Sequence, residues 1–172
     1  NVLWDFVELP SQIMENWCYE EEALELFARH YKTNKLIPKS IIKKIKASSH
    51  FQQGIQTIKQ LGLASLDLSY HSKDSCNIKN IKEHEDLILN KYQFLKSSKN
   101  QCLSSAFSHI FQGGYSSGYY SYKWAEVLDA DAFELFLENG IFNTKIAKKF
   151  EEHVLSKGGT EHPMKLYKRF RG

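Results

Sequence analysis

The chain has 172 residues, of which 42% are hydrophobic and 13% aromatic, and its formal net charge is +3. A chain of this length forms one domain or a large part of one, with enough apolar side chains for a substantial core. Its basic residues are dispersed, apart from a lysine cluster at residues 39–46 that is typical of a solvated helix face. A dedicated nucleic-acid surface needs a strong basic stripe, so no nucleic-acid partner is expected.

Three cysteines, Cys18, Cys76 and Cys102, are far apart and form no C-x-x-C pair. They therefore indicate neither a disulfide framework nor a zinc knuckle, and a reducing, cytoplasmic setting is expected. No apolar run approaches the roughly 18 to 20 residues that cross a bilayer, so no membrane partner is expected either.

Helical spacing of apolar residues runs through the first half of the chain. Asp5 and Glu8 form a D-x-x-E signal for a helix that continues to Trp17, although Pro10 should kink it. Further helices are predicted at residues 23–31, 41–45, 49–70 and 77–96, the first of them ending before Pro38.

The second half also shows helical spacing. One helix is predicted from about Tyr115 to Asn139, where Gly140 suits a left-handed cap. Asn143 is predicted to cap the next helix, and Pro163 to occupy the first turn of the last one. Because no alternation of period two is evident, we expect a mainly α, multi-helical fold in one compact unit.

The stretch from His109 to Glu126 holds four tyrosines within eight residues, beside three glycines. Buried tyrosines each need a partner for the hydroxyl, so this cluster suggests hydroxyls directed at a bound molecule. If the helix starts near Tyr115, then Tyr115, Tyr119 and Tyr122 share one face.

Gly113 and Gly114 precede that face in a turn that tolerates positive φ, with His109 just before it. A ligand-binding loop followed by a row of phenolic donors is one interpretation. The alternative is a helix rich in tyrosine and tryptophan that packs in a core, with the two glycines as a plain connector.

Glu8, Gln12 and Glu15 are spaced to share one helix face, but paired carboxylates on a helix are usually solvated. The seven histidines are scattered, and no H-x-x-x-H or H-E-x-x-H motif occurs. A conventional catalytic zinc site therefore cannot be completed from this chain alone. The sequence also has no G-x-S-x-G elbow, P-loop or dinucleotide fingerprint.

Two motifs occur together in this chain: D-F-V-E-L-P-S-Q from Asp5, followed by E-N-W from Glu15, and the stretch from His109 to Glu126. Together they resemble the thimet oligopeptidase family of zinc metallopeptidases, and within it the oligopeptidase A-like branch. The pair Gly158-Gly159 and the final K-R-F-R-G continue the likeness. It covers nearly the whole chain, although residues 32–100 share mainly the helical pattern.

The resemblance implies the C-terminal portion of a zincin-type peptidase catalytic domain, which hydrolyses peptide bonds in short peptides. Its single zinc ion is held by two histidines of an H-E-x-x-H helix and by a later glutamate that corresponds to Glu8. One coordination position stays open for water. Glu15, two turns further along, is then a candidate for orienting a metal ligand from the outer shell.

The same resemblance implies that the glycine-rich stretch is a substrate loop. His109, Tyr115 and Tyr122 are expected to be the catalytic donors that bind peptide carbonyls and stabilise the oxyanion of the tetrahedral intermediate. The remaining substrate-binding positions of this loop are expected to be Gly113, Gly114 and Tyr119.

The family's H-E-x-x-H helix lies upstream of Asp5, and its usual extension beyond the final Arg-Gly is missing here. Residues 1–172 are therefore expected to be a partial catalytic domain that partners the remainder of the parent chain. The isolated piece should bind zinc poorly, cleave nothing and self-associate through exposed apolar surface. The competing hypothesis is a non-catalytic helical module that binds a protein or peptide.

Overall fold

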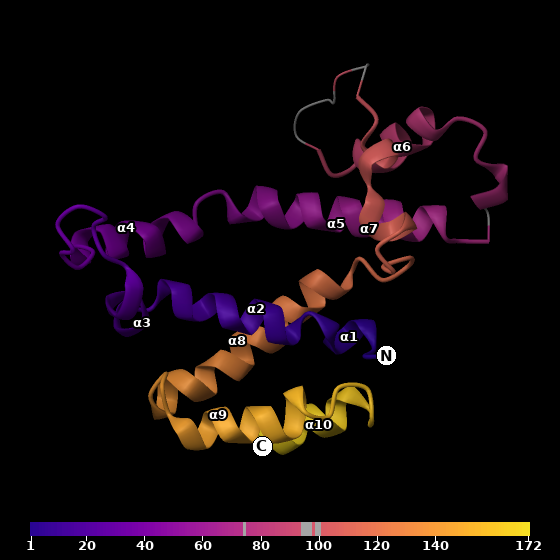
Figure 1. The fold of residues 1–172 in the computed structure, drawn as a ribbon. Helices are drawn as coiled ribbons and strands as arrows, with labels where there is room; N and C mark the ends of the chain where they lie inside the picture. Colours follow the sequence, from indigo (N-terminus) through magenta and orange to yellow (C-terminus); the bar gives the residue numbers. More distant parts are fainter. Residues whose placement is uncertain (74, 94–97, 99–100) are drawn as a thin grey trace. The chain divides into compact units, whose positions relative to one another are not determined.

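The computed structural model describes residues 1–73, 75–93, 98 and 101–172 (Figure 1). Helices are the only extended regular elements in these ranges, which otherwise contain one isolated antiparallel bridge between Arg29 and Leu36. The predicted mainly α, multi-helical fold is confirmed. None of the described helices is long and apolar enough to cross a membrane.

The chain divides into two compact units instead of the single one expected from the sequence. The first unit combines residues 1–51 with residues 124–172, and the second consists of residues 52–123. Each unit has a hydrophobic core of its own. The expectation of one unit was wrong because hydrophobic spacing identifies apolar helix faces without showing which faces pack together.

The first unit opens with two short helices, α1 (Trp4–Val7) and α2 (Leu9–Asn16), separated at Glu8. We expected a single kinked helix starting at Asp5, and this was wrong. Pro10 lies in the first turn of α2, where a missing N–H costs no helical hydrogen bond. The proline therefore accompanies the start of a second helix and does not kink a longer one.

The other helices of the first unit follow the predicted order (Figure 1). Their bounds are α3 (Glu21–Phe27), α4 (Lys39–Ser49), α8 (Ser121–Asn139, which belongs to this unit from residue 124), α9 (Thr144–Phe150) and α10 (Pro163–Arg171), with a short 3₁₀ helix η1 (Trp17–Tyr19) and a π-helix η4 (Glu151–Leu155). The helix predicted to reach Tyr31 ends at Phe27, and the Tyr31 side chain is 85% exposed.

Three helix-terminus predictions in this unit are confirmed. Gly140 follows α8 with φ of 94°. The side chain of Asn143 accepts from the backbone N–H groups of Lys145 and Ile146, at 2.9 and 3.3 Å. Pro163 is the first residue of α10. Caps of the Asn143 type contribute about 1 kcal/mol each, so these local signals fix helix ends well.

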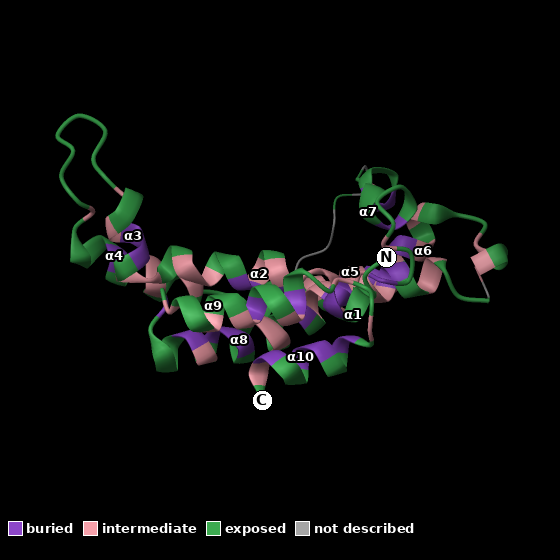
Figure 2. Cartoon of the chain, turned by 60° about the horizontal axis from the view of Figure 1, so that its bottom comes forward, coloured by how far each residue is buried: buried purple, intermediate pink, exposed green. Residues whose placement is uncertain are grey.

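Aromatic packing joins the N-terminal and C-terminal segments in the core of the first unit. The ring of Trp17 meets those of Phe133 and Phe136 edge-on, with centroids 4.7 and 4.9 Å apart. The indole N–H of Trp17 donates to the carbonyl oxygen of Ile141 at 3.0 Å. Figure 2 shows the corresponding buried stripes on α8 and α10. The apolar surface of the Trp17 ring is thus packed against other rings, and its N–H group has a hydrogen-bond acceptor.

The second unit is built on one long helix. Its elements are α5 (Gln53–Tyr70), α6 (Ile81–Leu89), α7 (Ser108–Phe111) and the short 3₁₀ helices η2 (Ser75–Asn77) and η3 (Leu103–Ala106). The helix predicted for residues 49–70 is confirmed with a later start. The helix predicted for residues 77–96 is shorter in its described part, and its last predicted residues lie outside the described ranges.

The core of this unit is small and consists of Leu66, Leu89, Phe107 and Ile110. It brings α5 and α6 together with the segment that leads into α7. Two buried carboxylates, Asp67 and Glu85, lie beside this apolar cluster. Buried carboxylates need hydrogen-bond donors, and both find theirs in the segment that contains the predicted substrate loop.

Candidate functional site

The glycine and tyrosine stretch of the second unit is a compact turn as far as residue 120. Helix α7 ends at Phe111, and α8 begins only at Ser121, so the helix expected from about Tyr115 was wrong at its start. The N–H of Tyr115 donates to the carbonyl of His109 at 3.1 Å, and the N–H of Gly118 donates to that of Tyr115 at 2.8 Å. Three glycines and two serines within this segment favour such turns over a helix.

Two of these glycines are required by the backbone path, which confirms the predicted turn. A Cβ atom on Gly113 would lie 2.9 Å from both the Cα and the carbonyl oxygen of His109. Gly114 has φ of +82°, a conformation that side-chain-bearing residues rarely adopt. The chain can therefore fold back closely against the end of α7.

The turn brings together the rings of His109, Tyr115, Tyr119 and Tyr122, hereafter the aromatic cluster. Tyr115 stacks on Tyr122 with centroids 5.3 Å apart and an interplanar angle of 22°, and Tyr119 lies 5.1 Å from Tyr122. The His109 ring lies 6.4 Å from that of Tyr115 and 6.1 Å from that of Tyr119. The sequence thus predicted the association of the tyrosines correctly but attributed it to the wrong backbone.

The aromatic cluster combines apolar ring surface with hydrogen-bond donors. The three tyrosines are half-buried, and His109 is exposed. Burial raises the pKa of the Tyr119 hydroxyl, and the neighbouring Tyr122 raises this pKa further. The Tyr119 phenol consequently remains a proton donor throughout the neutral range. Such a cluster can offer O–H donors to a carbonyl oxygen or to a developing oxyanion.

Asp67 of α5 is bonded to the turn that carries the tyrosines, a role that sequence patterns did not indicate. Its side chain is only 1% exposed. One carboxylate oxygen accepts from the N–H of Ser117 and the other from the N–H of Tyr119, both at 2.9 Å. The only sequence signal was an acidic residue next to Leu66, on the apolar side of a predicted helix.

Glu85 of α6 binds η3, the short helix that precedes α7 and the turn. Its carboxylate accepts from the N–H and the hydroxyl of Ser104, at 2.7 and 2.6 Å, and from the N–H of Leu103 at 3.1 Å. Burial by itself would raise the pKa of Glu85, but these hydrogen bonds, together with one from the thiol of Cys102, hold it below its ordinary value of 4.5. The charged form is therefore favoured in the folded unit.

Replacing Glu85 by glutamine in the full-length protein is expected to remove a pH dependence of local stability. Because the folded-state pKa lies below 4.5, the contribution of Glu85 is complete above the unfolded-state pKa and is lost as pH falls through the folded-state value. Wild-type hydrogen-exchange protection of the Leu103 and Ser104 amides should fall in acid. In Glu85→Gln the protection of these two amides should be lower than in the wild type at pH 7 and nearly independent of pH.

The measurement is hydrogen exchange followed by mass spectrometry, corrected for the pH dependence of the intrinsic exchange rates. The control is Glu83→Gln, an exposed glutamate on the same helix, which should retain the wild-type acid response. A wild-type response in Glu85→Gln would assign the effect to another group.

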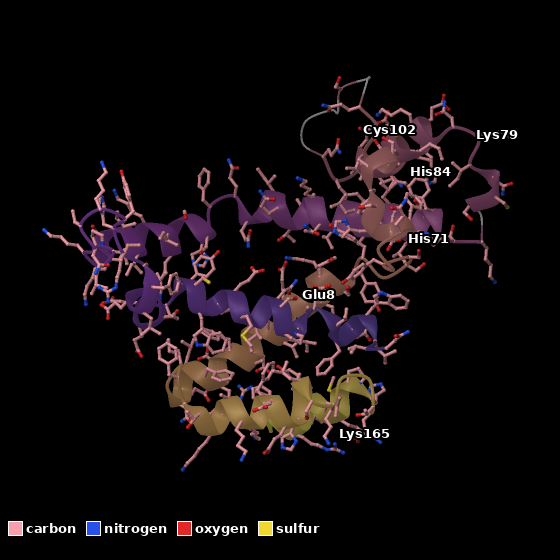
Figure 3. All side chains as sticks on the ribbon, in the orientation of Figure 1. Glu8, His71, Lys79, His84, Cys102 and Lys165 are labelled. Atoms are coloured by element: carbon pink, nitrogen blue, oxygen red, sulfur yellow. The ribbon has the colours of Figure 1, made fainter. Side chains whose placement is uncertain are left out.

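The predicted metal ligand, Glu8, belongs to the first unit and lies at the junction of α1 and α2 (Figure 3). Its side chain is half-buried and accepts from the Ser11 hydroxyl at 2.9 Å. Glu15 is exposed on α2. No group of three or more histidine, cysteine, aspartate or glutamate side chains that could hold a metal occurs among the described residues. The described residues around Glu8 therefore do not by themselves make up a three-ligand metal site.

All of residues 1–172 match peptidase family M3. The chain belongs to this family. It is 43% identical to oligopeptidase A of Haemophilus influenzae and 43% identical to that of Escherichia coli, in each case over 99% of this chain. It is 41% identical over its full length to a probable cytosolic oligopeptidase A of Arabidopsis thaliana.

These matches confirm the predicted family and its oligopeptidase A-like character. Each of the three alignments covers 25% of the relative, so the M3 chain spans about a quarter of the length of the curated relatives that it matches.

Proposed function

We propose that this chain is part of a zinc metallo-oligopeptidase that hydrolyses peptide bonds in short peptides. In this proposal it supplies the third zinc ligand and the side chains that bind the substrate and its oxyanion. The observation that carries the proposal is the aromatic cluster, which gathers several hydrogen-bond donors in a chain that matches a peptidase family along its whole length.

Glu8 is the proposed zinc ligand of this chain, and two histidines from the remainder of the parent protein complete the set. A half-buried carboxylate at a helix junction is suited to this role, since its oxygen atoms remain accessible without a large desolvation cost. Zinc, when bound, supplies Lewis-acid polarisation of the scissile carbonyl. Glu15 is proposed to orient a metal ligand from the outer shell.

The aromatic cluster is the proposed oxyanion site. His109, Tyr115 and Tyr122 donate hydrogen bonds to the peptide carbonyl and, more strongly, to the negative charge that develops on its oxygen. Mutual ring packing fixes the positions of these donors before substrate arrives, so little reorganisation accompanies the reaction. Tyr119 and the backbone at Gly113 and Gly114 are proposed to contact the substrate beside the scissile bond.

The parent enzyme is proposed to act in the cytoplasm on short peptides. The remainder of its own chain is the proposed partner of residues 1–172. The word "cytosolic" in the name of the Arabidopsis relative supports this location. Alone, residues 1–172 are proposed to be inactive, because the described residues do not provide a full set of metal ligands.

Chelation tests the proposal on the full-length protein. Cleavage of internally quenched short peptides should be lost after treatment with a chelator and restored by zinc, and the isolated chain 1–172 should show neither cleavage nor stoichiometric zinc. Cleavage that survives complete metal removal would contradict the zinc mechanism. A full-length protein that binds peptides without cutting them would favour the non-catalytic module.

A further inference from the structure

We propose that Asp67 is a positioning residue for catalysis, which holds the tyrosine-bearing turn in the geometry that the oxyanion requires. This inference rests on the proposed function and deepens it, because it adds a residue that contacts neither metal nor substrate. The observation behind it is a buried carboxylate whose two oxygen atoms each accept one backbone N–H of the turn.

The two amides that Asp67 binds belong to Ser117 and Tyr119, on either side of buried Gly118. Tyr115, at the start of the same turn, accepts through its carbonyl from the N–H of Gly118 at 2.8 Å. Asp67 thereby fixes the backbone between two members of the aromatic cluster. Movement of this short segment would displace the rings of both Tyr115 and Tyr119.

A second contact fixes the orientation of the Asp67 carboxylate itself. The Nδ1 atom of His71, one turn further along α5, lies 2.8 Å from the same oxygen that accepts from Ser117. Because a carboxylate only accepts hydrogen bonds, the imidazole donates through Nδ1. His71 is labelled near the end of α5 in Figure 3. The same imidazole N–H also lies within reach of the backbone carbonyl of Asp67, at 2.9 Å, so it is shared between the carbonyl and carboxylate oxygen atoms. Together with the two backbone donors, it limits the rotation of the carboxylate.

The backbone conformation of Ser117 shows why the turn needs such a contact. Ser117 has φ of 59°, in the left-handed region that non-glycine residues seldom occupy. A residue holds this conformation only when its surroundings compensate for the strain. The hydrogen bond from its N–H to the buried carboxylate is a contact of this kind.

Asparagine cannot replace this arrangement, although it has nearly the same shape. It offers one acceptor oxygen to two backbone donors and turns an N–H₂ group towards the other donor. One of the two amides would remain buried without its acceptor, and the turn would shift to relieve this. The result is misplacement of the donors without loss of any proposed donor side chain.

Kinetics of Asp67→Asn in the full-length enzyme provide the first test. We expect kcat for a short peptide to fall by about 10- to 100-fold, as for misplacement of reacting groups by about 1 Å. KM should change by less than about threefold, because the lost interaction is made mainly in the transition state. Asp86→Asn is the matched control, an aspartate on α6 of the same unit that pairs with Lys82 at a more exposed position. It should retain wild-type kcat.

A double-mutant cycle with Tyr115→Phe separates positioning from a merely structural role. If Asp67 acts by placing the Tyr115 hydroxyl, then Asp67→Asn should cost much less in the Tyr115→Phe background than in the wild type. Ser117→Gly, which removes the backbone strain, should recover part of the activity of Asp67→Asn. Additive losses in the cycle together with no recovery by Ser117→Gly would overturn the proposal.

Hydrogen exchange at the Ser117 and Tyr119 amides tests the contact independently of activity. Protection there should fall in Asp67→Asn and persist in Asp86→Asn. An inactive wild-type protein would overturn the proposed function, whereas unchanged protection in an active Asp67→Asn protein would overturn the positioning role alone. If Asp67→Asn does not fold, Asp67→Glu keeps both acceptors but displaces them, and its kcat should fall by about threefold to tenfold. Wild-type kcat in the folded glutamate variant would then overturn the role.

Discussion

Replacing Tyr122 by phenylalanine in the full-length protein is expected to lower kcat by about 10²- to 10³-fold, the usual effect of removing one oxyanion donor. The phenyl ring can still stack on Tyr115 as the tyrosine ring does, with centroids 5.3 Å apart. The fold and the metal content should therefore be preserved, and only the hydroxyl is lost. Steady-state kinetics on a short peptide, with zinc measured on the same preparation, provide the test.

Tyr120→Phe is the matched control for this prediction. Tyr120 is 39% exposed and lies in the same segment, and the proposed mechanism gives its hydroxyl no role. Loss of that hydroxyl should leave kcat within about twofold of wild type. Normal turnover in Tyr122→Phe would remove this hydroxyl from the proposed oxyanion site.

Replacing Glu8 by glutamine is expected to have the largest effect on the metal. The amide keeps the shape of the side chain but removes the negative charge that a zinc ligand provides, so zinc affinity should fall by more than the roughly 10- to 100-fold that outer-shell changes cause. Metal analysis after gel filtration of the full-length protein should show zinc well below one ion per chain. Activity should fall in parallel and recover partly at high zinc concentration.

Two further glutamate variants serve as comparisons for the zinc content of Glu8→Gln. Glu15→Gln should weaken zinc binding by about 10- to 100-fold if Glu15 orients a metal ligand. Glu22→Gln changes an exposed carboxylate of α3 in the same unit and should leave zinc content unchanged. Full zinc occupancy in Glu8→Gln would exclude Glu8 as a ligand, and equal losses in Glu8→Gln and Glu22→Gln would indicate a non-specific charge effect.

Much of the helical architecture could be predicted because its signals are local. The cap at Asn143, the left-handed Gly140 and the first-turn proline Pro163 each act within a few residues of the chain. One error arose where the same local signal fits two structures. At Pro10 the same residue can kink one helix or begin another, and the structure shows that it lies in the first turn of α2.

The sequence predicted that the tyrosine rings lie together, but it did not predict the backbone that brings them together. A spacing of three and four residues predicts a common helix face, yet Tyr115 and Tyr122 meet across a turn. Asp67 received no functional role in the prediction, because nothing in the sequence shows that its carboxylate faces amides 50 and 52 residues away. Contacts at such separations depend on how α5 packs against the segment before α8, and that packing leaves no periodic signal.

The sequence by itself therefore determined most of the helices, the helix ends at Gly140, Asn143 and Pro163, the peptidase family and the presence of a glycine and tyrosine stretch with donor side chains. These features follow from short-range propensities and from motifs that are contiguous in the chain. Only the tertiary structure decided that the chain forms two units, that the stretch is a turn, that buried Asp67 binds the backbone of this turn and that buried Glu85 binds the segment before α7. The physical reason is that a buried carboxylate must find donors, and only the folded chain shows which backbone amides supply them.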